Sequence, residues 1–152
     1  VQSPPLVIRN VVVTPVSIAD RRITKEAIPG WIRGWDVRTG EELWSYYTEA
    51  PVRFTPTIVG NKLIAGSDDG IVYCLRASSG ELIWKERVAP DDQRVPGNGR
   101  MISLWPVRTG VVVSNGVAYV TAGLFPSETS YVAALKVSDG KTVWKNSYKD
   151  GI

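Results

Sequence analysis

Histidine is absent from this chain of 152 residues, and cysteine occurs once. The lack of histidine excludes histidine-based zinc or copper sites, histidine general bases and covalent c-type haem attachment. The single cysteine, Cys74, excludes an intrachain disulfide, and its place in an apolar segment predicts a buried structural thiol.

Long apolar runs and strong charge are also missing. No stretch reaches the roughly 18 residues that a membrane-spanning helix needs, so no membrane span is expected. The N-terminus has no basic segment followed by an apolar one, so no signal peptide is expected. The 18 basic and 15 acidic residues are scattered and leave a net charge of +3, which argues against nucleic-acid binding.

What the chain does contain is one motif repeated three times. The copies span residues 30–44, 70–84 and 130–144, and share a glycine column (Gly40, Gly80 and Gly140) and a tryptophan column (Trp44, Trp84 and Trp144). Short β-branched runs separated by Gly, Asn and Asp turns surround each copy, and no segment has a helical period. We therefore expect strands at 4–8, 11–16, 31–37 and 42–48; at 54–59, 62–66, 71–76 and 81–87; and at 107–113, 116–122, 131–137 and 141–146.

Four-stranded units at a period near 40 residues are typical of a β-propeller. The sequence thus predicts an all-β fold of three four-stranded antiparallel propeller blades in one domain, residues 1–152. The blades are expected at about 4–48, 54–87 and 107–146. Because propellers typically have four to eight blades, three blades leave apolar faces uncovered. We expect either self-association, for which a two-fold pair gives six blades, or missing blades of a larger propeller.

The first copy, residues 34–44, resembles the tryptophan-docking motif of pyrroloquinoline-quinone (PQQ) dehydrogenases, Ala-x-Asp-x-x-Thr-Gly-x-x-x-Trp. It departs from that pattern only at Gly34. The other copies keep the glycine and the tryptophan. Each tryptophan follows a hairpin turn, where a large aromatic ring can set the spacing between blades. WD repeats are the nearest rival, but Trp35-Asp36 falls inside the motif of one copy only.

Extra residues gather at one end of the predicted blades. Copies one and three have long connections between their second and third strands, and a long connection joins copies two and three. In a four-stranded meander these connections lie at the same end, and insertions on one face of a repeat protein usually mark its binding face.

The resemblance to quinoprotein dehydrogenases assigns candidate roles in the first long loop, residues 17–26. Asp20 matches an acidic position that serves the calcium–quinone site. Arg21, Arg22 and Lys25 are candidates for binding PQQ carboxylates, since guanidinium forks suit bidentate recognition. The alternative is a solvated charged loop.

The second long loop, residues 90–105, offers a further set of candidates. Arg94, Arg100 and Trp105 could contact an anionic or planar ligand, and we include Arg100 and Trp105 among the cofactor-binding candidates. Asp91, Asp92 and Asn98 carry oxygen ligands of the kind calcium prefers, without the spacing of a known calcium loop. The alternative is a packed loop anchored by its aromatic residue.

Two functions remain open from the sequence. The first is a partial quinoprotein that oxidises an alcohol or sugar with PQQ and calcium once the ring is complete, although no catalytic base can be assigned. The second is a non-catalytic propeller scaffold or binding module that self-associates. The family resemblance implies a periplasmic or extracytoplasmic location.

Overall fold

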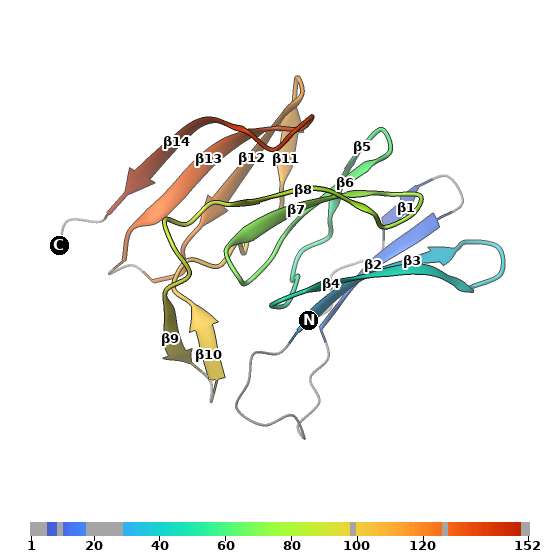
Figure 1. The fold of residues 1–152 in the computed structure, drawn as a ribbon, viewed down its shortest axis with the longest axis horizontal. Coiled ribbons are helices and arrows are strands. Elements are labelled where there is room, and N and C mark those ends of the chain that lie inside the picture. The colour runs from blue at the N-terminus through green and yellow to red at the C-terminus, as the bar shows by residue number, and fades with distance from the viewer. Residues whose placement is uncertain (1–5, 9–10, 18–28, 98–99, 126–127, 150–152) are drawn as a thin grey trace.

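The computed structural model describes residues 6–8, 11–17, 29–97, 100–125 and 128–149, and these form an all-β fold (Figure 1). Three four-stranded antiparallel sheets follow one another along the chain, each in the order of its strands. This confirms the predicted fold class of a partial propeller. The described residues contain no helix of the length and apolarity needed to cross a membrane.

The strands correspond closely to those expected. The first sheet contains β1 (Leu6–Ile8), β2 (Val11–Ser17), β3 (Gly30–Asp36) and β4 (Glu42–Thr48). The second contains β5 (Thr57–Val59), β6 (Lys62–Gly66), β7 (Ile71–Arg76) and β8 (Leu82–Arg87). The third contains β11 (Val112–Ser114), β12 (Val117–Ala122), β13 (Ser130–Lys136) and β14 (Thr142–Tyr148). We refer to these sheets as blades 1, 2 and 3.

The glycine column forms the same turn in every blade. Gly40, Gly80 and Gly140 have φ angles of 73°, 71° and 75°, a left-handed conformation that favours glycine. Each donates its amide to the carbonyl four residues earlier at 2.8 Å. The turn is therefore set by local sequence and repeats without change.

Two tryptophans of the repeat join consecutive blades. Trp44 of blade 1 donates its indole N–H to the Ala77 carbonyl of blade 2 at 3.1 Å. Trp84 of blade 2 donates in the same way to the Val137 carbonyl of blade 3 at 2.9 Å. Two apolar clusters lie around these contacts, one between blades 1 and 2 and the larger between blades 2 and 3. The core is thus a pair of interfaces between sheets.

The structure differs from the sequence prediction in two places. The inner strands β5 and β11 begin only at Thr57 and Val112, and the segments before them are irregular. The second long loop contains a hairpin, β9 (Arg94–Gly97) and β10 (Arg100–Ser103), which the prediction treated as a loop. Its Asn98-Gly99 dipeptide is a strong hairpin signal that was missed, because the segment lies outside the repeat.

Candidate binding surface

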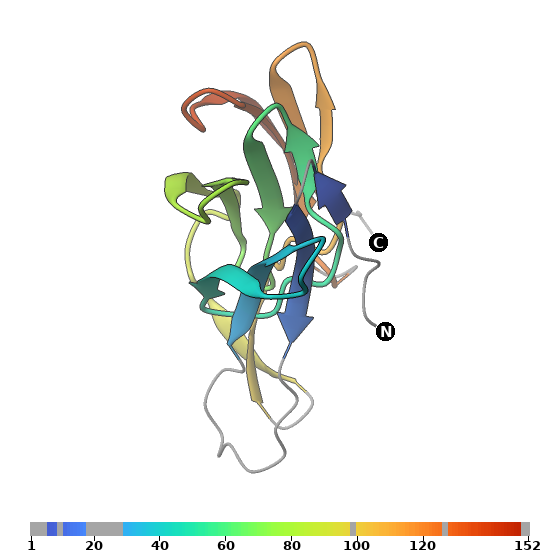
Figure 2. The ribbon, with the colours of Figure 1, turned by 90° about the vertical axis from the view of Figure 1, so that its right-hand side faces the viewer.

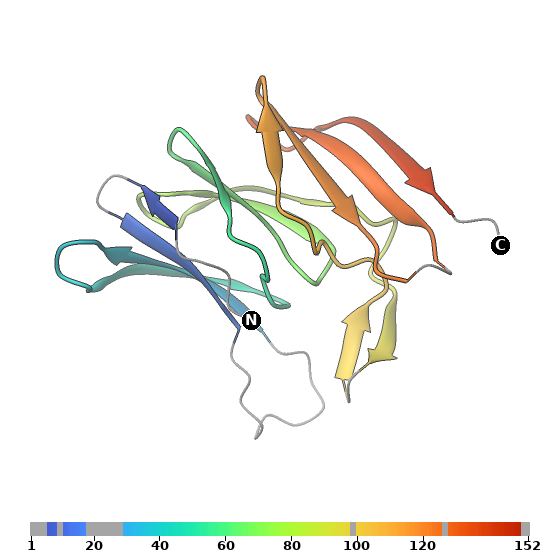
Figure 3. The ribbon, with the colours of Figure 1, turned by 180° about the vertical axis from the view of Figure 1, so that it is seen from behind.

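The long connections leave and re-enter the described strands at one end of the three blades. The ends of β2 and β3 pair there through Ser17 and Gly30, and the hairpin of β9 and β10 extends from the same end in both views (Figures 1 and 2). The turn between β6 and β7, residues 67–70, lies there as well, as the view from behind shows (Figure 3). We call this the loop-bearing end.

This end contains a buried carboxylate, Asp68. Its oxygens accept two hydrogen bonds from Arg108, at 2.9 and 3.0 Å, and one from Arg53 at 2.5 Å. Arg53 belongs to the segment that enters blade 2, and Arg108 to the segment that enters blade 3. Bidentate arginine–carboxylate pairs are among the stronger charge-assisted contacts. Asp68 therefore fixes the entry segments of two neighbouring blades to each other.

Sequence reasoning missed this triad, although a signal for it exists. The tripeptide Pro-Val-Arg occurs at residues 51–53 and again at 106–108, each time four residues before the start of an inner strand. The proline carbonyls have matching roles, since Pro51 accepts the Asp68 amide at 2.9 Å and Pro106 accepts the Gly123 amide at 3.1 Å. The repeat therefore extends beyond the tryptophan motif into the entry segments.

Asp69, next to the triad, is almost fully buried. Its carboxylate accepts a hydrogen bond from the Tyr73 hydroxyl at 2.7 Å and another from the Ile71 amide at 2.9 Å. Burial raises the pKa of Asp69 above its ordinary value of 3.8, and these hydrogen bonds oppose that shift only in part. Burial, with the Asp69 charge beside it, also raises the pKa of Tyr73.

Replacing Asp69 with asparagine is expected to change how stability depends on pH. A carboxyl whose pKa is raised in the folded state binds protons more readily there, so folding stability falls as pH rises above 3.8 through the folded value. Asp69→Asn has no such charge to bury. Urea unfolding at a series of pH values from about 4 to 7 should show the free energy of unfolding of the variant increasing relative to that of the wild type as pH rises. A constant difference would contradict the burial argument.

The β9–β10 hairpin is attached to the blades through polar and apolar contacts. The Arg94 guanidinium forms a bidentate pair with the Asp92 carboxylate, at 3.1 and 3.2 Å. It also lies 3.6 Å from the carboxylate of Glu49, which belongs to the connection between β4 and β5. The hydrogen bond to Asp92 raises the pKa of Arg94. At the base of the hairpin, Trp105 is buried in the core and meets the Tyr131 ring edge-on at 5.9 Å.

The candidate residues predicted from the sequence have mixed outcomes. Asp20, Arg21, Arg22, Lys25 and Asn98 lie outside the described residues. Arg100 begins β10 opposite Gly97. Trp105 packs inside the core, and its buried indole N–H has no hydrogen-bond partner among the described residues. Asp91 accepts the amide of Gln93 at 2.8 Å in an exposed turn, while Asp92 pairs with arginines.

Cys74 is fully buried, as predicted, and burial raises the pKa of its thiol to about 11. Within the part of the chain that the structure describes, no three Asp, Glu, Cys or His side chains are grouped closely enough to hold a metal ion. The two buried acids, Asp68 and Asp69, have their oxygens engaged by arginine, tyrosine and backbone groups.

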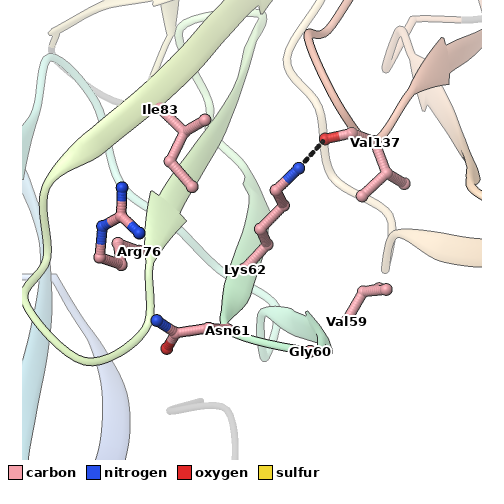
Figure 4. A pocket seen from close by; sticks show the side chains of 7 residues that line it. All are labelled: Val59, Gly60, Asn61, Lys62, Arg76, Ile83 and Val137. Atoms are coloured by element: carbon pink, nitrogen blue, oxygen red, sulfur yellow. Dashed lines mark hydrogen bonds between the residues drawn. The ribbon is translucent and has the colours of Figure 1, made fainter.

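A groove of about 430 Å³ lies at the opposite end, between blades 2 and 3 (Figure 4). The β5–β6 turn, residues 59–62, forms one wall, with Arg76, Ile83 and Val137 around it. Lys62 extends across the groove and donates to the Val137 carbonyl at 3.4 Å. Since that carbonyl also accepts the Trp84 indole, the groove belongs to the contact between the blades.

The sheets, the glycine turns and the docked tryptophans define a β-propeller built of PQQ-like repeats. Residues 69–151, more than half of the chain, match the PQQ-like family model described as outer membrane protein assembly factor BamB, and the chain belongs to this family. Residues 1–54 match a second model, the β-propeller domain of glucose, ethanol and alcohol dehydrogenases.

Curated relatives support the same assignment. The BamB of Moranella endobia is 26% identical over 136 residues, which cover 86% of this chain and 33% of that protein. The BamB of Legionella pneumophila is 29% identical over 91 residues, which cover 60% of this chain and 21% of that protein. The chain thus spans a third or less of the length of these relatives.

Solved structures agree in fold. A quinohemoprotein alcohol dehydrogenase from Comamonas testosteroni superimposes with a TM-score of 0.73 at 16% identity, over 97% of this chain and 21% of that one. The quinohemoprotein alcohol dehydrogenase from Pseudomonas putida HK5 superimposes with a TM-score of 0.71 at 19% identity, over 96% of this chain and 20% of that one. BamB from Moraxella catarrhalis superimposes with a TM-score of 0.54 at 18% identity, over 94% of this chain and 50% of that one. The chain therefore shares its fold with both dehydrogenase and BamB propellers.

Proposed function

We propose that this chain is part of a non-catalytic, extracytoplasmic propeller that binds extended polypeptide segments during the assembly of outer-membrane proteins. The observation that carries this proposal is the β9–β10 hairpin at the loop-bearing end. It forms a sheet of only two strands, and no described strand pairs with either of its outer edges. An open edge of this kind binds an extended segment by adding it as a further strand.

The two edges of the hairpin are not equivalent. Pro96 on β9 has no amide hydrogen, which blunts that edge. Pro96 pairs with Met101 on β10. Because proline cannot donate, this pair is a non-hydrogen-bonded one, and the Met101 amide points away from β9. The Met101 side chain is exposed as well. We therefore assign the binding edge to β10.

The membership in the BamB family and the sequence relatives named as assembly factors support this function. The outer-membrane proteins that such a factor serves are rich in extended strands, which suits recognition by strand addition. Arg94 and Asp92, paired at the base of the hairpin, hold it in a defined position relative to Glu49 in the connection between blades 1 and 2.

A PQQ-dependent oxidoreductase is the second candidate, favoured by the match of residues 1–54 to the dehydrogenase propeller model. The described residues of the loop-bearing end do not fit a calcium–quinone site. The Asp68 carboxylate is paired with two arginines, and the Asp69 carboxylate faces Tyr73 and a backbone amide. We derive no catalytic step from them.

Replacing Met101 with proline tests the binding edge. The change removes the outward amide hydrogen of β10 and leaves the ladder with β9 intact, so binding of an extended segment is expected to weaken at least about tenfold. The probe is a fluorescein-labelled peptide of about eight residues, the length of a typical strand, copied from an outer-membrane β-barrel, with anisotropy as the readout.

Met101→Ala is the matched control, because it removes the same side chain and keeps the amide. It is expected to bind within about threefold of the wild type. Equal losses in the two variants, or no binding by the wild type, would overturn strand addition at β10. A parallel titration with PQQ and calcium chloride separates the second candidate, since saturable quinone absorbance at one molecule per chain supports an oxidoreductase.

A further inference from the structure

A lysine crosses the groove between blades 2 and 3 (Figure 4). The apolar part of the lining comes from Val59 and Ile83 of blade 2 and Val137 of blade 3, which belong to the larger core cluster or pack against it. Lys62, at the start of β6, is half-buried and extends over these side chains toward blade 3. The groove therefore places a positive charge over an apolar lining.

The repeat shows that a lysine is not needed here to join two blades. By register, Lys62 pairs with the last residue of the inner strand, as Val11 does in blade 1 and Val117 in blade 3. Between blades 1 and 2, Val11 packs against the core cluster, and the docked tryptophan makes its indole hydrogen bond there at 3.1 Å, compared with 2.9 Å beside Lys62. The same contact forms with valine at this position, which indicates a separate role for the lysine.

The Lys62 ammonium is held only weakly. It donates to the Val137 carbonyl at 3.4 Å, a long hydrogen bond, and that carbonyl already accepts the Trp84 indole at 2.9 Å. No ion pair among the described residues includes Lys62. Arg76, the other cation of the groove, pairs with Glu81 at 3.3 Å. An incoming anion can therefore bind Lys62 without leaving a buried carbonyl unpaired.

We propose that this groove binds the carboxyl terminus of a polypeptide that ends in an apolar residue. The terminal carboxylate pairs with the Lys62 ammonium, and the last side chain packs on Val59, Ile83 and Val137. A charged hydrogen bond of this kind is stronger than the one that Lys62 makes to a carbonyl. The groove volume of about 430 Å³ is near the lower end of the range for ligand sites, about 300–1,000 Å³, which suits a short apolar group better than a long acyl chain.

This site is separate from the β10 edge. The β5–β6 turn forms one wall of the groove and lies at the end opposite the β9–β10 hairpin (Figure 1). Every lining residue belongs to blade 2 or to the turn that follows β13 in blade 3, and these two blades contact each other directly. The groove is thus formed within one interface between consecutive blades.

The test compares two peptides by fluorescence anisotropy. Both have the sequence Gly-Ser-Gly-Val-Leu with fluorescein at the N-terminus, and one ends in a free carboxylate while the other ends in an amide. The wild type should bind the free acid at least about tenfold more tightly than the amide, because only the acid pairs with Lys62. Strand addition at β10 does not distinguish the two peptides, so this preference reports on the groove. Lys62→Val, which gives blade 2 the residue of blades 1 and 3, should lose the preference.

Lys85→Val is the matched control, because Lys85 is exposed on β8 of the same blade and does not line the groove. It should keep the preference of the wild type for the free acid. Circular dichroism confirms that both variants are folded. Equal affinity for the acid and the amide, or a preference that survives Lys62→Val, would overturn the proposal. So would failure of the wild type to bind the acid, including the case in which decanoate binds instead and identifies a fatty acid as the occupant.

Discussion

Replacing Trp84 with alanine is expected to lower the free energy of unfolding by about 3–5 kcal/mol, the range for truncating a buried tryptophan. The ring fills the space above Gly140 in the larger of the two core clusters. Its loss also removes the indole hydrogen bond that joins blades 2 and 3. Urea unfolding followed by circular dichroism measures the effect without depending on tryptophan fluorescence.

Trp144→Ala provides a control of identical chemistry, because the two tryptophans occupy the same column of the repeat. Trp144 is 45% exposed, so its loss should cost less than about 1 kcal/mol. Similar losses at the two positions would mean that docking between blades is not what stabilises the chain.

The second large effect is expected at Asp68. Asp68→Asn keeps the shape of the side chain and removes its charge, which leaves Arg53 and Arg108 facing each other without the carboxylate that holds them. Removing one partner of a buried ion pair costs about 3–5 kcal/mol. Because both arginines are partly exposed, with Arg53 at 43%, we expect about 2–4 kcal/mol.

Glu81→Gln is the matched control for Asp68→Asn. Glu81 pairs with Arg76 at 3.3 Å, but both side chains are exposed, and the change should cost less than about 1 kcal/mol. Thermal or urea unfolding of the two variants under the same conditions makes the comparison. If Asp68→Asn costs no more than Glu81→Gln, the triad does not hold the entry segments together.

Local chemistry explains why the sequence predicts the blades so well. The glycine turns require positive φ and the strands require β-branched alternation, and both are properties of short stretches. The hairpin of β9 and β10 was missed although Asn98-Gly99 marks it, because it falls between repeats. The start of β5 was placed too early for a different reason. The residues before Thr57 lie outside the sheet, and among them Arg53 contacts Asp68, a partner distant in sequence.

The sequence by itself determined the all-β class, the three blades, the docking role of the tryptophans and the burial of Cys74. Only the tertiary structure decided how the polar residues of the loop-bearing end are paired. Asp68 contacts Arg53, which is 15 residues away in the sequence, and Arg108, which is 40 residues away. No local sequence pattern specifies contacts between residues so far apart in the chain. It also decided that Trp44 and Trp84 are covered while Trp144 is exposed. Tryptophans at the same position of the repeat differ in this way because burial depends on which blade lies next to each of them, a property of the assembled chain.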